Sequence, residues 1–181
     1  MVGIIPEGTP EERKRKLLEG LESGRMPLML FLHEMDELLR EEPPPGPSRG
    51  KAVAVCFDRH TEGRDLMAIL LKIERFEVIV PDRDIDLQSV VDLCDDPDVR
   101  VLCFSVSTTT GCYDIRRMGE LLTEAGIRGR IVYNAGGAPV TEEIAESAGC
   151  DVFSRRAIDA VRLIVDKVSS AGESGDYGDD P

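Results

Sequence analysis

The 181-residue sequence contains no tryptophan, and aromatic residues make up only 4% of it. Proteins that bind single-stranded nucleic acid stack the bases on aromatic side chains, and binding to the phosphate backbone relies on clustered lysine and arginine. Here 35 acidic residues face 22 basic ones, which gives a formal net charge of -13. The composition therefore argues against a nucleic-acid partner.

Long apolar runs are also lacking. No stretch is long and apolar enough to span a bilayer, and the first ten residues have neither the basic start nor the apolar centre of a signal peptide. We therefore expect a cytoplasmic protein that is not associated with a membrane. The length allows one ordinary α/β domain with a short appendage.

The cysteines form no C-x-x-C pair, and their number, five, is odd. They are scattered over predicted strands, helices and their ends, at Cys56, Cys94, Cys103, Cys112 and Cys150. This scatter favours reduced thiols used in packing over a zinc site or a disulfide framework.

Composition divides the chain into a short helical N-terminal region (1–42), a Pro-rich linker (43–50), a main domain (51–168) and an acidic tail (169–181). In the first region, helical spacing predicts helices over 9–24 and 27–41. Two short helices bury little on their own, so we expect them to dock on the main domain or on a partner. The tail is rich in Ser, Gly and Asp without periodicity, and we expect it to be disordered.

The main domain alternates apolar runs with helical patterns. Strands are predicted at 52–57, 77–81, 100–106, 130–134 and 151–154, and helices at 63–75, 87–95, 113–125, 141–147 and 157–168. Such alternation predicts an α/β fold with a flavodoxin-like, doubly wound, five-stranded parallel sheet in the order 2-1-3-4-5. Ligands of such folds bind at the carboxyl ends of the strands, here between strands one and three.

The first strand ends abruptly in the loop Asp58 to Gly63. In this loop His60 has a carboxylate two residues before it and a glycine three residues after it. That arrangement suits a metal ligand oriented by an acid that bonds its other ring nitrogen. The plainer alternative is a surface histidine that only caps the following helix.

Two further loops should meet the first at the same sheet edge. The loop after strand three carries a run of hydroxyls, Ser105 to Thr110, which offers hydrogen bonds to a polar ligand or caps the next helix. The loop after strand four contains Gly136 and Gly137, and paired glycines allow close backbone approach or a positive φ. Together these loops predict a slot between strands three and four, floored by glycine and walled by Ser and Thr.

Three motifs in register resemble a known family. The residues Asp58-x-His60-x-x-Gly63, the segment Asn134 to Glu143 and the following Ala148 to Asp151 resemble the corrinoid-binding domain of methyltransferase corrinoid proteins, methionine synthase and cobalamin-dependent mutases. The Gly-Gly-Ala-Pro-Val-Thr segment is most similar to that of the methyltransferase carrier proteins. The resemblance extends from Lys51 to Val168, about two thirds of the chain.

The resemblance implies a cofactor and a role for each motif residue. The cofactor would be cobalamin, as methylcobalamin or a related corrinoid, with His60 as the lower axial ligand to cobalt in place of the cofactor's own base. Asp58 would bond the other ring nitrogen of His60, and Gly63 would let the next helix begin beside the nucleotide tail. Ser105 and Thr109 would contact that tail, and Gly136 and Gly137 would floor the slot that receives it.

The resemblance also implies a methyl carrier, the corrinoid subunit of a methyltransferase system and not a complete enzyme, which works with a methyltransferase partner. The alternatives are a cobalamin-binding subunit of a radical mutase, with a mutase partner subunit, and a cofactor-free sensor or interaction module. The sequence departs from the family pattern at Ser107, where leucine is usual, and at Thr61-Glu62, where Asp-Ile is usual. The family's four-helix bundle is also shortened to about two helices, so the upper face of the corrin would be covered by a partner or by a second copy in a homo-oligomer.

Overall fold

The computed structural model describes residues 8–173, which fall into two compact units that meet between Pro47 and Ser48. The first unit is a pair of helices, α1 (Pro10–Glu22) and α2 (Leu28–Glu41), which contact each other. Helix α1 begins with a capping box between Thr9 and Glu12, which satisfies backbone donors at the helix start. An ion pair of 3.5 Å between Arg13 and Glu41 joins the two helices.

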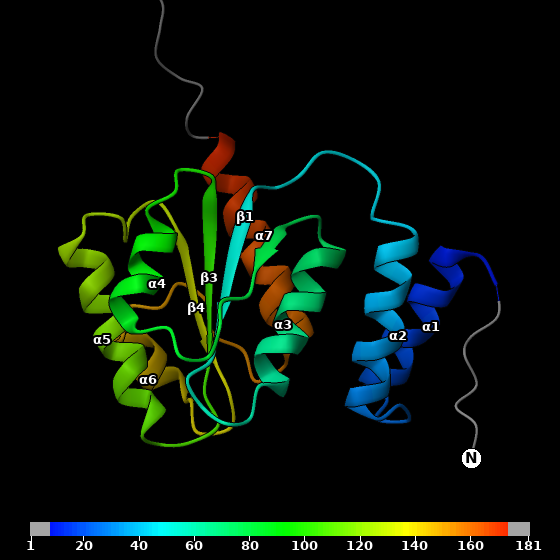
Figure 1. Ribbon diagram of the computed structural model, residues 1–181, viewed down its shortest axis with the longest axis horizontal. Helices are drawn as coiled ribbons and strands as arrows, with labels where there is room; N and C mark the ends of the chain where they lie inside the picture. Colours follow the sequence, from blue (N-terminus) through cyan, green and yellow to red (C-terminus); the bar gives the residue numbers. More distant parts are fainter. Residues whose placement is uncertain (1–7, 174–181) are drawn as a thin grey trace, which may run out of the picture. The chain divides into compact units, whose positions relative to one another are not determined.

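The second unit alternates strands and helices along the chain (Figure 1). Its strands are β1 (Lys51–Val55), β2 (Glu77–Ile79), β3 (Val99–Ser105) and β4 (Val132–Gly136). Its helices are α3 (Glu62–Ile73), α4 (Leu87–Cys94), α5 (Gly111–Glu124), α6 (Glu142–Ser147) and α7 (Ala157–Glu173).

The described strands form a parallel sheet in the order β2-β1-β3-β4, which is the predicted order for these four. The predicted fifth strand at 151–154 was wrong, because this segment joins the sheet only through one parallel bridge between Val152 and Asn134. Its neighbour on β4 explains why. The backbone N–H groups of Asp151 and Val152 both donate to the Tyr133 carbonyl, and the Tyr133 N–H donates to the Asp151 carboxylate. The Asp151 side chain therefore accepts the Tyr133 N–H, which the backbone of a fifth strand would otherwise have bound.

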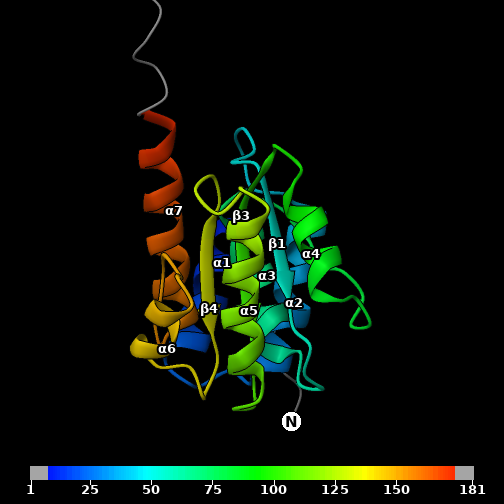
Figure 2. The same cartoon turned by 90° about the vertical axis from the view of Figure 1, so that its left-hand side faces the viewer.

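Helices cover both faces of the sheet. Helices α3 and α7 lie on one face, and α4, α5 and α6 lie on the other (Figures 1 and 2). Strands β1, β3 and β4 are mostly buried on both faces, as parallel strands between helical layers must be, whereas the edge strand β2 is partly exposed. Fully buried Val53, Leu102 and Ile115 belong to the core between the sheet and its helices.

The predicted disordered tail at 169–181 overlaps the last helix. Helix α7 continues to Glu173, so residues 169–173 are helical and do not belong to a disordered segment. The remainder of the expected tail, 174–181, lies outside the described residues, as do residues 1–7. Among the described helices, none combines the length and the apolar character needed to cross a bilayer.

All the cysteines are free thiols, as expected. Burial raises the pKa of Cys94, Cys103 and Cys150 to about 12, so these three remain protonated at neutral pH. Their role is therefore packing.

The Tyr133 hydroxyl offers a test of the packing of β4 on α5. It donates a buried hydrogen bond of 2.7 Å to the carbonyl oxygen of Ile115. Replacing Tyr133 with phenylalanine should lower the free energy of unfolding by about 1 kcal/mol, because the buried hydrogen bond to the Ile115 carbonyl is lost. Urea unfolding at pH 7 measures the change. The control is Tyr113→Phe at a residue that is 78% exposed, where a change below about 0.5 kcal/mol is expected. Equal effects at both positions would contradict this account.

Candidate functional site

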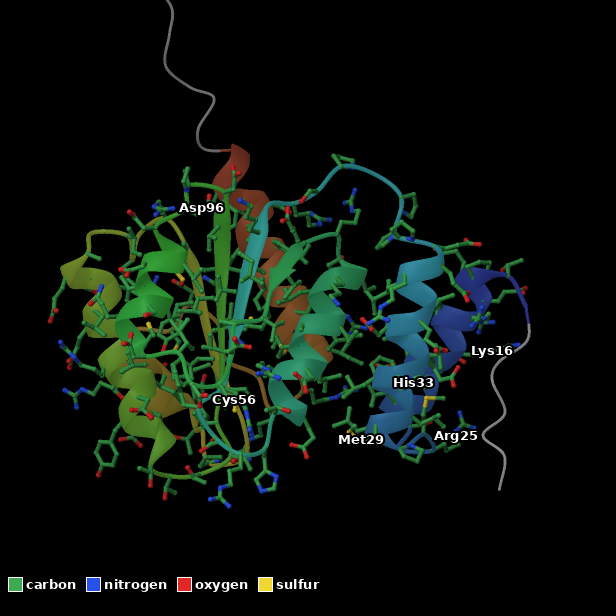
Figure 3. The ribbon with its side chains drawn as sticks, in the orientation of Figure 1. Lys16, Arg25, Met29, His33, Cys56 and Asp96 are labelled. Carbon is green, nitrogen blue, oxygen red and sulfur yellow. The ribbon has the colours of Figure 1, made fainter. Side chains whose placement is uncertain are left out.

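The loops that the sequence singled out lie at one end of the sheet. Strands β1, β3 and β4 end at Val55, Ser105 and Gly136, and parallel strands place their carboxyl ends at a shared edge. Figure 3 marks this end by Cys56, the residue after β1, and the opposite end by Asp96, which precedes β3. The three loops therefore converge as predicted.

A cavity of about 340 Å³ opens at this edge. Its walls come from β3 and β4 on one side and from α3 and α7 on the other. Gly63, Ser105, Gly136 and Gly137 line it, although they come from three separate stretches of the sequence. The cavity thus brings together four of the seven predicted site residues.

Gly136, at the end of β4, and Gly137, in the loop that follows, have different structural roles. A Cβ added to Gly136 would meet nothing within 4 Å, so this position faces open space. A Cβ added to Gly137 would collide with the carbonyl oxygen of Val106, and its φ of +130° also favours glycine. Gly136 therefore keeps the cavity open, whereas Gly137 allows β4 and the loop after β3 to approach each other.

Gly63 is also required because another residue, Ser105, approaches its Cα closely. A Cβ at this position would collide with the hydroxyl oxygen of Ser105. The first turn of α3 therefore lies directly against the end of β3, as the sequence motif requires of its glycine. Gly63 and Ser105 are a pair of predicted site residues that the fold places in contact.

His60 lies on an exposed loop three residues before Gly63. Its side chain is 73% exposed, and its Nδ1 atom is 3.8 Å from Oε2 of Glu62. The Cys56 thiol donates to the His60 carbonyl oxygen across 3.2 Å, which holds the backbone of the loop close to the end of β1. His60 does not line the cavity itself, but the short segment to Gly63 connects the two.

Asp58 binds a different partner from the one expected. Its carboxylate accepts hydrogen bonds from the backbone N–H of Ser107 and, at 3.0 Å, from the hydroxyl of Thr108. Burial acts to raise the pKa of Asp58, but these hydrogen bonds outweigh it and the pKa is lowered. The described hydrogen bonds include none between Asp58 and His60, and Asp58 joins the loop after β1 to the loop after β3.

Thr109 lies apart from the cavity. Its side chain is exposed, and its carbonyl oxygen accepts the backbone N–H of Cys112. The alternative was that the hydroxyl run caps the next helix. Thr110 precedes α5, but its hydroxyl makes no capping hydrogen bond. Within the run, Ser105 lines the cavity and Thr108 binds Asp58.

Three polar residues of the cavity, Asn134, Ser154 and Arg155, were not predicted as site residues. Asn134 lies within β4 and is 3% exposed, and Arg155 precedes α7. A buried asparagine in a parallel strand was the available signal, because such strands are otherwise nearly continuous apolar runs. The described residues hold no cluster of three or more His, Cys, Asp or Glu side chains that would bind a bare metal ion.

The Asp58 hydrogen bonds predict a stability effect. Asp58→Asn should lower the free energy of unfolding by about 1 kcal/mol at pH 7, because the charged acceptor of the Ser107 and Thr108 hydrogen bonds is lost. Because the pKa of Asp58 is lower in the folded state, its carboxylate stabilises the fold at pH values above the unfolded-state pKa. This stabilisation is lost as the pH falls through the folded-state pKa. The difference between the two proteins should therefore shrink below about pH 3.9.

Urea unfolding across this pH range measures the effect. Asp166→Asn at an exposed position of α7 is the control, and a change below about 0.5 kcal/mol at pH 7 is expected there. A difference for Asp58→Asn that grows toward acid pH would contradict the assignment.

Comparison with known proteins yields relatives but no match to a family model. The chain is 34% identical over 113 residues to trimethylamine corrinoid protein 2 of Methanosarcina acetivorans, a match that covers 62% of this chain and 52% of that protein. It is 31% identical over 104 residues to dimethylamine corrinoid protein 3 of the same organism, covering 58% of this chain and 49% of the relative. The chain spans about half the length of the curated relatives it matches.

Solved structures show the same fold. A cobalamin-binding protein from Desulfitobacterium hafniense matches with a TM-score of 0.66 and 23% identity, over 87% of this chain and 79% of that one. The methanol:cobalamin methyltransferase complex of Methanosarcina barkeri matches with a TM-score of 0.73 and 18% identity, over 88% of this chain and 65% of that one. The resemblance to corrinoid proteins that the motifs indicated is confirmed by the curated relatives.

Proposed function

We propose that this chain binds a corrinoid cofactor and carries a methyl group on it within a methyltransferase system. One observation carries the proposal. Gly63, Ser105 and Gly136, which come from separate motifs, line a single cavity at the carboxyl edge of the sheet. The similarity to corrinoid proteins of trimethylamine and dimethylamine supports the same conclusion.

The residues present fit the nucleotide tail of such a cofactor. The cavity lies between helices and strands, and the position of Gly136 leaves it open at the sheet. The tail would enter beside Gly63 and Ser105, so that the domain from 51 to 168 supplies all of the tail-binding residues. Thr109 would reach the tail only from the exposed loop after β3.

The exposed imidazole of His60 suits a ligand to the cobalt of the corrinoid. Its Nδ1 atom faces Glu62 at 3.8 Å, which leaves Nε2 for the metal. Glu62 is a departure from the family pattern, and its carboxylate lies where it can orient the His60 ring. Asp58 meanwhile binds the loop after β3. When bound, the corrinoid supplies the cobalt chemistry, and the protein supplies ligation, orientation and shelter.

We propose a methylamine as the source of the methyl group, which a methyltransferase partner would load and a second partner would remove. The chain is then the carrier subunit and not a complete enzyme. The curated relatives favour the carrier.

The test is a binding experiment with hydroxocobalamin. After mixing and gel filtration, the coloured cofactor should elute with the protein, and its visible spectrum should be that of cobalamin whose own base has left the cobalt. Cobinamide, which lacks the nucleotide tail, should bind at least tenfold more weakly. If all the cofactor elutes as a small molecule, the proposal fails.

A further inference from the structure

Asn134 is a buried polar residue that the proposed tail-binding role does not use. It is 3% exposed and lines the cavity from the middle of β4. Alternate residues of a strand point to the same face, so Asn134 lies on the same face as Gly136 and one step deeper into the sheet. Since a side chain is missing at Gly136, the cavity is open above Asn134.

The Asn134 amide has one described side-chain partner. Its neighbour across the ladder is Cys103, a buried thiol whose pKa the Asn134 amide acts to lower against the larger effect of burial. A thiol is a weak partner, whereas an amide carries two N–H donors and an oxygen with two lone pairs. Buried polar groups are normally satisfied, so the remaining capacity of this amide is available to whatever occupies the cavity.

The chemistry of the amide selects its ligand. Natural corrinoids differ in the base that ends the nucleotide tail, and these bases include dimethylbenzimidazole and purines. An asparagine amide can make two hydrogen bonds with the N1 and N6 edge of adenine, where a ring-nitrogen acceptor lies beside an N–H donor. The outer edge of dimethylbenzimidazole carries methyl groups, which would leave the buried amide without a partner.

We propose that Asn134 is a specificity-determining residue, which makes this cavity prefer a corrinoid with a purine base over one with dimethylbenzimidazole. This inference rests on the proposed function, because it assumes that the tail enters the cavity. Asn134 would recognise the base at the bottom of the cavity, and the open position at Gly136 would let the base reach it.

The experiment compares two pure cofactors on the full chain. The wild-type protein is titrated with adeninylcobamide and with cobalamin, and binding is followed by the visible spectrum and by calorimetry. We expect adeninylcobamide to bind at least tenfold more tightly, a difference of about 1.4 kcal/mol. In Asn134→Leu, which has a similar volume and no hydrogen-bonding group, the ratio should fall below about threefold.

The matched control is Ser147→Ala on α6, a residue outside the cavity, where the ratio should stay at the wild-type value. Equal or tighter binding of cobalamin by the wild-type protein would overturn the inference, even if Asn134→Leu fails to fold. So would a ratio that survives in Asn134→Leu. Either result leaves the proposed function standing, whereas the absence of binding to both cofactors overturns the two together.

Discussion

Replacing Gly136 with leucine should abolish corrinoid uptake while the protein remains folded. The Cβ of a residue at this position would meet nothing within 4 Å, so the new side chain would extend into the cavity and occupy the path of the tail. No neighbour has to move to admit the Cβ, and the backbone there does not adopt a positive φ. We expect at least a hundredfold loss of affinity for cobalamin and a change in unfolding free energy within about 0.5 kcal/mol.

The neighbouring glycine provides a matched contrast. Gly137→Ala adds one carbon, yet this atom would collide with the Val106 carbonyl at a φ of +130°. We expect this smaller substitution to lower the unfolding free energy by about 1–3 kcal/mol. Gel filtration with hydroxocobalamin and urea unfolding separate the two effects. Normal uptake by Gly136→Leu would show that the tail does not enter this cavity.

Removing the imidazole of His60 should change the ligation of cobalt far more than the affinity. The cavity is lined by residues other than His60, so His60→Ala keeps every tail contact and should lose less than tenfold in affinity. In the wild-type protein with ¹⁵N-labelled histidine, the electron paramagnetic resonance spectrum of the cobalt(II) form should show splitting by the labelled nitrogen. In His60→Ala this splitting should vanish.

The sequence contains two histidines, and the second one is the natural control. His33 lies on α2 and is 66% exposed, with Glu37 at 3.6 Å. His33→Ala should leave the nitrogen splitting unchanged. Splitting that persists in His60→Ala, or that disappears in His33→Ala, would exclude His60 as the ligand.

Hydrophobic periodicity was sufficient to predict the α/β alternation and the order of four strands, because buried parallel strands are apolar runs bounded by polar turns. It failed at 151–154, where the run looks like a strand but the Asp151 carboxylate takes the backbone donor of Tyr133. Periodicity also placed the end of β4 at Asn134, two residues early, because Ala135 and Gly136 look like part of a glycine-rich loop. Register in the ladder, with Gly136 opposite Ser105, could not be deduced from composition.

The candidate site was predictable where a motif fixed the backbone and less so where a side chain had alternatives. Gly63 and Gly137 owe their identity to close approaches that only glycine permits, and such constraints leave a mark in the sequence. Asp58 was expected to bond His60, but backbone and hydroxyl donors of the loop after β3 were within reach. Asn134 stands out in the sequence as a polar residue in an apolar strand, but its place in the wall of the cavity is visible only in the fold.

The double attachment of Asp58 to Ser107 and Thr108 creates a thermodynamic link between two loops. Any change in the first loop that turns the Asp58 carboxylate away removes the acceptors of Ser107 and Thr108, and any change that orders the loop after β3 holds the carboxylate in place. Coupling of this kind is reciprocal, so each event must oppose the other by the same free energy. Ordering of either loop is therefore expected to shift the conformational equilibrium of the other, although the two loops lie about 50 residues apart in the sequence.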